Sequence, residues 1–338
     1  MERYMKTIGI GVIGCGGMGR SLANGANAVE GIDVVCVSDL QEELAKTLAD
    51  NLNTNYTTNY HELLANDSIQ AVLLASPPFL HAQMAVDAAN AGKHVFSEKP
   101  MAPTLEDCDA MIAAASENDI KLTIGLVCRY HATHSKVREI VHSGELGAPV
   151  NMMVHRIGGP WSGGNRVPWR LERAKSGGSL MEINAHEIDF MRWTCGDVSK
   201  VYGVGGQYIH EHTDYPDVVL ASLNFENGAV GLLHSSHAAA VGGYGGRVDC
   251  EKGSIYFPQI WGGDAAIQIK PFEGEGRSIR ISDIQVPPPV QQEIRVFVEA
   301  IRNDTPPLIT GADGRAAVEI ALAAYKSVEI GQPIALPL

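Results

Sequence analysis

Two patterns of hydrophobic and polar residues divide the chain at about residue 127. In the first part, short and mostly apolar runs alternate with longer stretches of helical periodicity. The apolar runs lie at residues 8–13, 32–37, 71–75, 94–97 and 120–125, and the helical stretches at 18–29, 41–53, 81–91 and 104–118. Runs that need burial on both faces are typical of parallel strands. Residues 1–127 are therefore predicted to form a doubly wound parallel sheet, and the fold class is α/β.

Beyond about residue 150, polar and apolar residues alternate and turn residues become frequent. Strands are predicted at residues 150–157, 200–208, 218–225, 229–237, 247–251, 254–257 and 266–270, and helices at 135–142, 180–194, 290–302 and 314–330. Short links such as 226–228 and 252–253 join neighbouring strands in the manner of hairpins. Residues 128–338 are therefore predicted to form an α+β domain for substrate binding and oligomerisation, with a large, mostly antiparallel open sheet. Its C-terminal helices are free to pack back on the first domain.

A glycine-rich turn follows the first predicted strand and precedes the first predicted helix. Gly14, Gly16 and Gly19 fit the pattern G-x-G-x-x-G, with Gly17 and Met18 between them. The first glycine permits a tight turn, the second lets the backbone approach a pyrophosphate, and the third lets helix and strand pack closely. Glycine makes up 36 of 338 residues, so the spacing alone is weak support. Its strand–turn–helix context nevertheless predicts a Rossmann-type dinucleotide-binding loop.

Asp39 closes the second predicted strand, 20 residues after Gly19. A carboxylate at this place accepts hydrogen bonds from a ribose diol and repels a 2′-phosphate. The residues that follow, Leu40 to Glu43, offer no Arg or Lys to hold such a phosphate. The expected cofactor is therefore NAD, with NADP less favoured.

Charge and cysteine content narrow the class of protein. The chain carries 26 Lys and Arg against 39 Asp and Glu, a net charge of −13, which argues against a nucleic-acid partner. Its six cysteines form no C-x-x-C pair, so a reducing cytoplasm is the simplest location. No stretch approaches 18 apolar residues, and the first apolar run belongs to a strand, so we expect neither a membrane span nor a signal peptide.

Glu98-Lys99-Pro100 follows a predicted parallel strand at its carboxyl end, where ligands gather in open α/β sheets. A lysine at this place can meet a substrate hydroxyl beside a nicotinamide and take part in proton transfer. Pro100 removes a backbone donor and ends the strand. The alternative interpretation is a surface turn, and the tripeptide alone does not decide between the two.

A second group of polar residues lies in residues 177–189, GGSLMEINAHEID. Glu182 and His186 are spaced i and i+4, so on one helix they would share a face. An imidazole is suited to removing a hydroxyl proton, and Asp189 is placed to orient or charge-balance it. The alternative is a helix with a structural, hydrogen-bonded histidine. The dinucleotide loop favours the catalytic interpretation.

Together these motifs resemble the Gfo/Idh/MocA oxidoreductases, the family of glucose–fructose oxidoreductase and inositol 2-dehydrogenase. The C-terminal stretch ADGRAAVEIA, residues 312–321, adds to the resemblance, which covers nearly the whole chain in the family's order. It implies that Lys99 and His186 are catalytic. The acid four residues before the histidine is commonly Asp in the family and is Glu182 here, so its role as a substrate-binding or histidine-supporting group is less secure.

The resemblance also implies contacts with the cofactor and the substrate. Around the nicotinamide half of the cofactor it places Ser76, Pro77, His81 and Glu98, and near the nicotinamide and substrate it places Arg129, Trp169 and Arg170. Trp161, in the glycine-rich loop 158–166, either stacks on a sugar ring as part of a lid or belongs to a solvent loop, and the lid is preferred. Five arginines are candidates for a substrate carboxylate or phosphate: Arg129, Arg156, Arg166, Arg170 and Arg173.

Two histidine pairs, His131/His134 and His210/His212, have spacings that suggest a metal. No nearby Cys, Asp or Glu set completes either site, so we expect no metal.

The sequence therefore predicts an NAD-dependent dehydrogenase acting on a secondary alcohol of a sugar, cyclitol or sugar derivative. His186 accepts the hydroxyl proton, Lys99 assists and Glu182 holds a neighbouring hydroxyl or the imidazole. One alternative is an enzyme that retains NAD and cleaves a glycoside through a transient keto-sugar. A less favoured alternative is a non-catalytic NAD-binding sugar sensor. The open sheet needs a cover, so we expect a homodimer or homotetramer.

Overall fold

The computed structural model describes residues 7–159, 161 and 167–338. By its internal contacts the chain forms two compact units, each described by itself below. The first unit contains the residues up to Val127 together with Pro287–Arg315, and the second contains Cys128–Val286 and Ala316–Leu338. The first unit is therefore built from two separate stretches of sequence.

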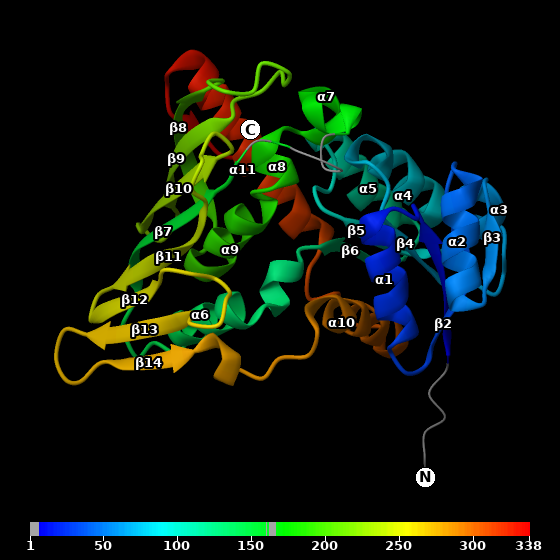
Figure 1. The fold of residues 1–338 in the computed structure, drawn as a ribbon, viewed down its shortest axis with the longest axis horizontal. Helices are drawn as coiled ribbons and strands as arrows, with labels where there is room; N and C mark the ends of the chain where they lie inside the picture. Colours follow the sequence, from blue (N-terminus) through cyan, green and yellow to red (C-terminus); the bar gives the residue numbers. More distant parts are fainter. Residues whose placement is uncertain (1–6, 160, 162–166) are drawn as a thin grey trace, which may run out of the picture. The chain divides into compact units, whose positions relative to one another are not determined.

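The first unit is organised around a six-stranded parallel sheet in the order β3-β2-β1-β4-β5-β6 (Figure 1). Its strands are β1 (Ile8–Ile13), β2 (Ile32–Ser38), β3 (Asn55–Thr57), β4 (Ala71–Leu74), β5 (His94–Glu98) and β6 (Leu122–Gly125). Every residue of β1, β4 and β6 is buried, as the apolar runs predicted. The strand order reverses between β1 and β4, and in open α/β sheets ligands bind at such a reversal. The predicted doubly wound sheet is confirmed.

Six α-helices belong wholly to this unit in the described part of the chain: α1 (Gly17–Asn27), α2 (Glu42–Leu52), α3 (Tyr60–Leu64), α4 (His81–Asn90), α5 (Leu105–Glu117) and α10 (Pro289–Asn303). Helix α5 begins as predicted, because the Thr104 hydroxyl accepts the Asp107 N–H at 3.1 Å. Helix α10 contacts α1, and its Phe297 lies edge-on to Phe96 of β5. A segment some 290 residues along the chain thus completes the core of the first unit.

The second unit is organised around a nine-stranded sheet in the order β14-β13-β12-β11-β7-β10-β9-β8-β15. Its strands are β7 (Pro149–Ile157), β8 (Val198–Gly206), β9 (Val218–Phe225), β10 (Val230–Ser236), β11 (Gly243–Cys250), β12 (Gly253–Phe257), β13 (Ala266–Pro271), β14 (Arg277–Arg280) and β15 (Ile334–Ala335). All neighbours are antiparallel except β10 and β7. The mostly antiparallel sheet is confirmed, and the predicted hairpins join β9 to β10 and β11 to β12.

Helices lie along one face of the nine-stranded sheet (Figure 1). They are α6 (Ala132–His142), α8 (Ser179–Glu182), α9 (Ala185–Cys195) and α11 (Gly311–Ile330), the first turn of which belongs to the first unit. The short helix α7 (Arg173–Ser176) contacts α8. The close approach of α11 to β8 needs a glycine, because a Cβ at Gly203 would lie 2.6 Å from the Ala324 carbonyl oxygen. The side chain of Tyr325 is fully buried, and its hydroxyl accepts the Leu180 N–H at 2.8 Å. Helix α11 is thereby tied to α8.

The continuous helix predicted over residues 180–194 is wrong. Helix α8 ends at Glu182 and α9 begins at Ala185, with Asn184 as the N-cap residue of α9. Asn184 leaves the helical path because its side chain has its own partners: the amide nitrogen donates to Glu187 at 2.8 Å and the oxygen accepts from Ser235 at 2.6 Å. The spacing of Glu182 and His186 predicted that they would share one face of a helix. They do not, because they belong to two different helices.

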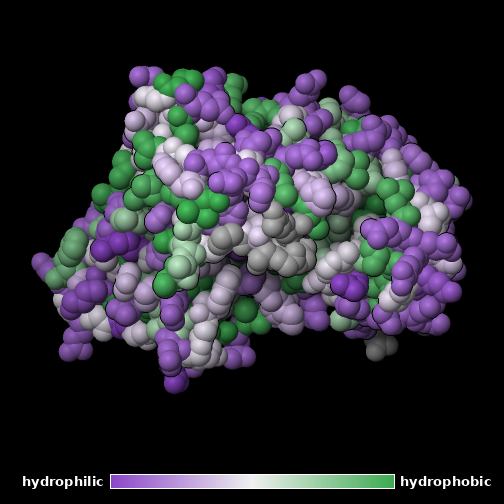
Figure 2. Space-filling model, turned by 45° about the horizontal axis from the view of Figure 1, so that its top comes forward, coloured by the Kyte–Doolittle hydropathy of each residue, from purple (hydrophilic) through white to green (hydrophobic). Residues whose placement is uncertain are grey.

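In the face drawn in Figure 2, hydrophilic and hydrophobic residues are interspersed. No helix in the described part of the chain combines the length and hydropathy that crossing a bilayer requires.

Candidate active site and nucleotide-binding loop

The glycine turn after β1 is tightly built where the motif requires glycine. Gly14 has a φ of 97°, and a Cβ there would lie 2.7 Å from the Ala75 backbone. A Cβ at Gly19 would lie 1.7 Å from the Gly14 carbonyl oxygen, so only glycine lets α1 start this close to the turn. These contacts place the start of α1 at the reversal point of the sheet.

The residues at the start of α1 fit the pyrophosphate of a dinucleotide. A Cβ at Gly16 or Gly17 would meet no atom within 4 Å, so the backbone borders open space there. Helix α1 begins at Gly17, and the first N–H groups of a helix have no acceptor within it. Met18, the next residue, is 44% exposed.

Asp39 stands beside this turn. Its Oδ2 accepts the Cys15 N–H at 2.8 Å and its Oδ1 accepts the Gln41 N–H at 2.9 Å. The carboxylate is thus fixed at the end of β2, and each oxygen keeps a lone pair with which it can accept a ribose hydroxyl. Burial and the charge of Asp39 raise the pKa of the Cys15 thiol to about 12, so the thiol stays protonated. The loop fits the sugar and phosphates of a dinucleotide.

The loops after β4 and β5 are joined by His81. Its ring nitrogens lie 2.8 Å from the Ser76 carbonyl oxygen and 3.0 Å from that of Pro100, and the residue is 1% exposed. His81 therefore supports the loops that carry Ser76, Pro77 and Lys99. The Ser76 hydroxyl is buried and has no hydrogen-bond partner in the described part of the chain. An unsatisfied hydroxyl at this edge is available to a bound ligand.

Lys99 follows β5 and is half-buried, and its N–H donates to the Glu98 carboxylate at 3.1 Å. Glu98 is 6% exposed and packs where Gly125 of β6 has no side chain. Burial, and then the charge of Glu98, raise the pKa of Glu293 on α10 well above its usual value. Neither Glu293 carboxyl oxygen has a partner among the described residues. Lys99 therefore stands beside a buried pair of acids that the sequence did not indicate.

Glu182, in the second unit, is held by Arg170. The Arg170 Nε donates to the Glu182 Oε1 at 2.8 Å, and Glu182 is 7% exposed. The guanidinium lies 4.9 Å from the centre of the Trp169 ring and 5.5 Å from that of Trp161. Trp169 and Arg170, which were predicted to meet the substrate, thus also fix the direction of the Glu182 carboxylate.

His186 lies in the first turn of α9 and is 9% exposed. On the same helix, both carboxylate oxygens of Asp189 accept hydrogen bonds from Arg129, at 2.6 and 2.8 Å, and both side chains are almost fully buried. Arg129, predicted to contact the cofactor and substrate, is therefore bound to α9, and the Asp189 carboxylate that was predicted to orient or balance His186 is paired with Arg129.

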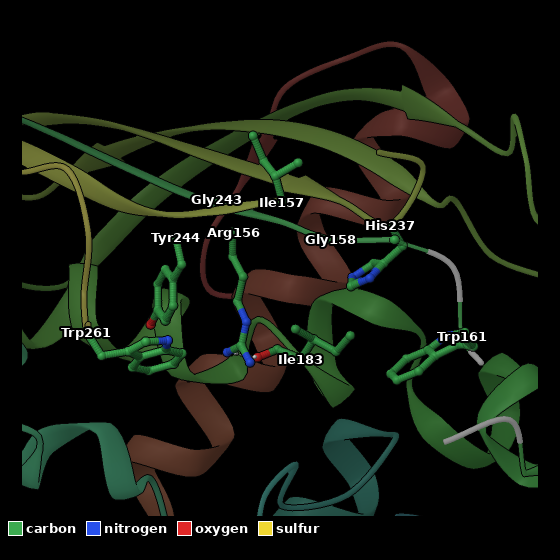
Figure 3. Close-up of a pocket in the computed structure, with 10 residues that line it drawn as sticks. Arg156, Ile157, Gly158, Trp161, Ile183, His237, Gly243, Tyr244 and Trp261 are labelled. Atoms are coloured by element: carbon green, nitrogen blue, oxygen red, sulfur yellow. Dashed lines mark hydrogen bonds between the residues drawn. The ribbon is translucent and has the colours of Figure 1, made fainter. Parts of the chain in front are cut away.

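A pocket of about 460 Å³ opens in the second unit beside the segment that carries these residues. It is lined by the end of β7, the start of β11 and three aromatic side chains: Trp161, Tyr244 and Trp261 (Figure 3). Ile183, three residues before His186, also lines it. The pocket has the size and the aromatic lining of a small-molecule site.

Trp161 is placed at one side of this pocket. Its ring is parallel to the His237 imidazole within 5°, and its Nε1 donates to the Tyr215 hydroxyl at 3.0 Å. The face turned toward His237 is therefore occupied. Of the loop predicted to act as a lid, residues 160 and 162–166, with the candidate Arg166, lie outside the described residues.

No group of three or more His, Cys, Asp or Glu side chains in the described residues is arranged to hold a metal ion. His134 donates to or accepts from the Tyr244 hydroxyl at 2.9 Å, and His210 bonds to the His237 carbonyl oxygen at 2.8 Å. Both histidines thus have structural partners.

All six cysteines are free and buried. Arg173 pairs with Glu329 at 2.5 Å on α11.

Sequence reasoning missed several residues of the site: Glu187, Asn184, Ser235, His237, Trp261 and Glu293. Trp261 had a detectable pattern, because like Trp161 it is a tryptophan within a glycine-rich loop. Ser235 and Glu293 had none, because they meet their partners only in the folded chain: Ser235 is 51 positions from Asn184, and Glu293 is 195 positions from Glu98.

Comparison with known proteins gives one consistent family. Residues 8–126 match the family described as "Oxidoreductase family, NAD-binding Rossmann fold", and residues 134–256 match "GFO/IDH/MocA C-terminal domain". The chain is 27% identical to a myo-inositol 2-dehydrogenase of Thermotoga maritima, over 95% of this chain and 96% of that protein. It is 27% identical to a 2,7-anhydro-N-acetylneuraminate hydratase of Mediterraneibacter gnavus, over 68% of this chain and 61% of that protein.

Among solved structures, the fold is similar to that of an aldose-aldose oxidoreductase from Caulobacter crescentus complexed with glycerol. The TM-score is 0.88 at 25% identity, and the match covers 98% of this chain and 100% of the other.

Proposed function

Because the chain belongs to the Gfo/Idh/MocA oxidoreductase family, we propose that it is an NAD-dependent dehydrogenase of a secondary alcohol in a sugar, cyclitol or related polyol. The observation that carries the proposal is the position of His186 at the start of α9, three residues after Ile183 of the aromatic pocket. A buried imidazole on the helix that follows a pocket-lining residue is suited to moving a hydroxyl proton.

The proposed roles are those that the sequence predicts for each residue. His186 accepts the proton of the substrate hydroxyl, and Lys99 assists this proton transfer. Glu182, directed by Arg170, accepts a hydrogen bond from a neighbouring hydroxyl. When bound, NAD supplies the acceptor for the hydride equivalent that leaves the carbon. The names of two similar proteins, an inositol dehydrogenase and an aldose oxidoreductase, support a polyol as the substrate.

The preference for NAD over NADP rests on Asp39. Its carboxylate is held by two backbone amides at the end of β2, where it would oppose a 2′-phosphate. The cytoplasm is the proposed compartment, because six free cysteines suit reducing conditions.

A second function on the same site is elimination or hydration of a sugar with NAD retained. The similarity to a 2,7-anhydro-N-acetylneuraminate hydratase favours keeping it. It differs from the first function in its product, because added NAD undergoes no net reduction. A non-catalytic sugar sensor is the least favoured function, since Lys99 and His186 are both present.

A second copy of the chain is the proposed cover for the open face of the nine-stranded sheet. One row across the sheet, in register, runs from Tyr202 through Ser222, Leu232, Met153 and Arg247 to Tyr256. Tyr202, Met153 and Tyr256 are each at least 40% exposed. A face of this kind is suited to a homodimer, or to a homotetramer of two such dimers.

The test is a panel of aldoses, inositols, sugar acids and glycosides, assayed for reduction of NAD and of NADP. We expect NAD reduction with at least one neutral polyol. Lys99→Ala and His186→Ala should each lower turnover by about a hundredfold or more, the usual scale of acid–base catalysis. Near-normal turnover in either variant would remove the role given to that residue. Glycoside cleavage without net NAD reduction would favour the second function.

A further inference from the structure

Arg156 is the cation of the aromatic pocket. It extends from β7 into the pocket between Tyr244 and His237, and its side chain is 31% exposed (Figure 3). Its Nη1 donates to the Glu187 Oε1 at 3.0 Å, and the guanidinium lies 5.0 Å from the centre of the Tyr244 ring. The guanidinium charge that could bind a carboxylate or phosphate of a substrate is therefore already paired with Glu187.

Glu187, the partner of Arg156, is fixed from behind. It lies on α9 and is 0% exposed. Its second oxygen accepts from the Asn184 side chain at 2.8 Å, and Asn184 in turn accepts from Ser235 at 2.6 Å. A buried carboxylate held in this way stays next to its cation, because separating the two would leave an uncompensated buried charge.

The other titratable groups of the pocket are uncharged near neutral pH. Burial, together with the neighbouring His210 and Arg156, lowers the pKa of His237 to about 4. Burial and the charge of Glu187 raise the pKa of the Tyr244 hydroxyl well above its usual value. Behind Tyr244, burial lowers the pKa of His134 to about 3. Among the described lining residues there is therefore one cation, Arg156, and Glu187 balances its charge.

The uncharged groups of the pocket match the surface of a polyol ring. Trp261 is 54% exposed and lies edge-on to Tyr244 at 5.1 Å, so it offers an aromatic face to C–H groups. The His237 Nε2 is buried and has no hydrogen-bond partner in the described part of the chain. A hydroxyl both donates and accepts, so it satisfies this nitrogen in either tautomer.

We propose that this pocket is a subsite for an uncharged polyol ring, in which Arg156 and His237 bind hydroxyls and Glu187 disfavours carboxylated and phosphorylated substrates by balancing Arg156. The inference rests on the proposed function, because it names the substrate class of the same site. It excludes the carboxylate- or phosphate-binding role that the sequence left open for Arg156.

The first experiment measures binding of four probes to the full chain by calorimetry, with and without NADH. The probes are glucose, myo-inositol, glucuronate and glucose 6-phosphate. We expect the neutral pair to bind at least about tenfold more tightly than the anionic pair, which corresponds to about 1.4 kcal/mol. Equal or tighter binding of an anionic probe would overturn the inference, and so would binding of none of the four.

The second experiment removes the negative charge of the pair in one variant and the positive charge in another. Glu187→Gln leaves Arg156 unbalanced, so the affinity for glucuronate relative to glucose should rise by about tenfold. Arg156→Gln should move the same ratio the other way, and it serves on its own if Glu187→Gln does not fold. Arg277→Gln, which removes an arginine of β14 paired with Glu145 outside the pocket, should leave the ratio unchanged. A ratio that moves in neither pocket variant contradicts the inference.

The two proposals fail in different ways. Absence of NAD reduction with every substrate, combined with a preference for neutral probes in binding, refutes the dehydrogenase alone. Turnover of glucuronate in preference to neutral sugars refutes the neutral pocket alone.

Discussion

The Asp39 carboxylate is fixed in place by backbone amides, one of which belongs to the glycine turn after β1. Its two oxygens accept from the amides of Cys15 and Gln41, so the carboxylate keeps its position without help from a nucleotide. The sequence predicted the acid and its use from spacing alone, because the strand–turn–helix unit is local. What spacing does not reveal is that the same side chain also supports the glycine turn.

Asp39→Asn separates these two functions. An asparagine oxygen can still accept the Cys15 amide, whereas the charge that opposes a 2′-phosphate is lost. We expect the ratio of NADPH to NADH affinity to rise by about tenfold, with little change in thermal stability. Fluorescence titration with both reduced cofactors measures the ratio. An unchanged ratio would mean that Asp39 does not select the cofactor.

The pocket shows why some residues escape a reading of the sequence. Arg156 was found as a candidate because charge is visible in a sequence. Its balance by Glu187 was not found, because the pair joins residues 31 positions apart across a strand and a helix. Lys99, Glu182 and His186 keep their proposed roles as predictions, and each rests on a motif whose residues are neighbours in the chain.

At the scale of elements, the break between α8 and α9 depends on one buried amide. Asn184 is 0% exposed and joins Glu187 of α9 to Ser235 of β10. Helical periodicity continues through residues 180–194, which is why the sequence predicted one helix. Periodicity reports which face is buried, and it does not detect a side chain that competes for the backbone at a single position.

Asn184→Ala should lower the free energy of unfolding by about 2–3 kcal/mol, because it leaves both Glu187 and the Ser235 hydroxyl short of a buried partner. Ser235→Ala removes only the second hydrogen bond and should cost about 1 kcal/mol. Urea denaturation of the two variants measures the difference. If Asn184→Ala is as stable as the parent chain, the amide does not hold the break.

Most long elements of both sheets were predictable, because each is bounded by turn residues and has one period. Strands β3, β14 and β15 were missed. They contain three, four and two residues, too few to show a period, and they exist only through pairing with β2, β13 and β8. The parallel pairing of β10 with β7 was likewise beyond the sequence, since two strands about 80 residues apart carry no mark of their partner.

At the scale of the molecule, the open sheet face should decide the oligomeric state. Val204 and Leu220 lie opposite each other on this face, 45% and 36% exposed. Replacing each by Glu should shift the protein from an oligomer to a monomer, because two unpaired charges would enter an apolar interface. Light scattering after size exclusion measures the mass.

Val241→Glu, at an 84% exposed position outside the strands, is the matched control and should leave the mass unchanged. A parent chain that is monomeric at micromolar concentration would contradict the proposal that a second copy covers the open sheet face.

The discontinuous first unit has a consequence for how the protein is made. Helix α10 covers part of α1 at Gly25, where a Cβ would lie 3.0 Å from Val290 and 3.2 Å from Ile294. The ribosome releases α10 only after about 160 further residues, Cys128–Val286, have been added. At a synthesis rate of about 5–20 residues per second, this apolar face of α1 stays uncovered by α10 for on the order of ten seconds. The first domain to emerge is therefore completed only after most of the second has been synthesised, and until then its uncovered apolar face is a site where a chaperone can bind.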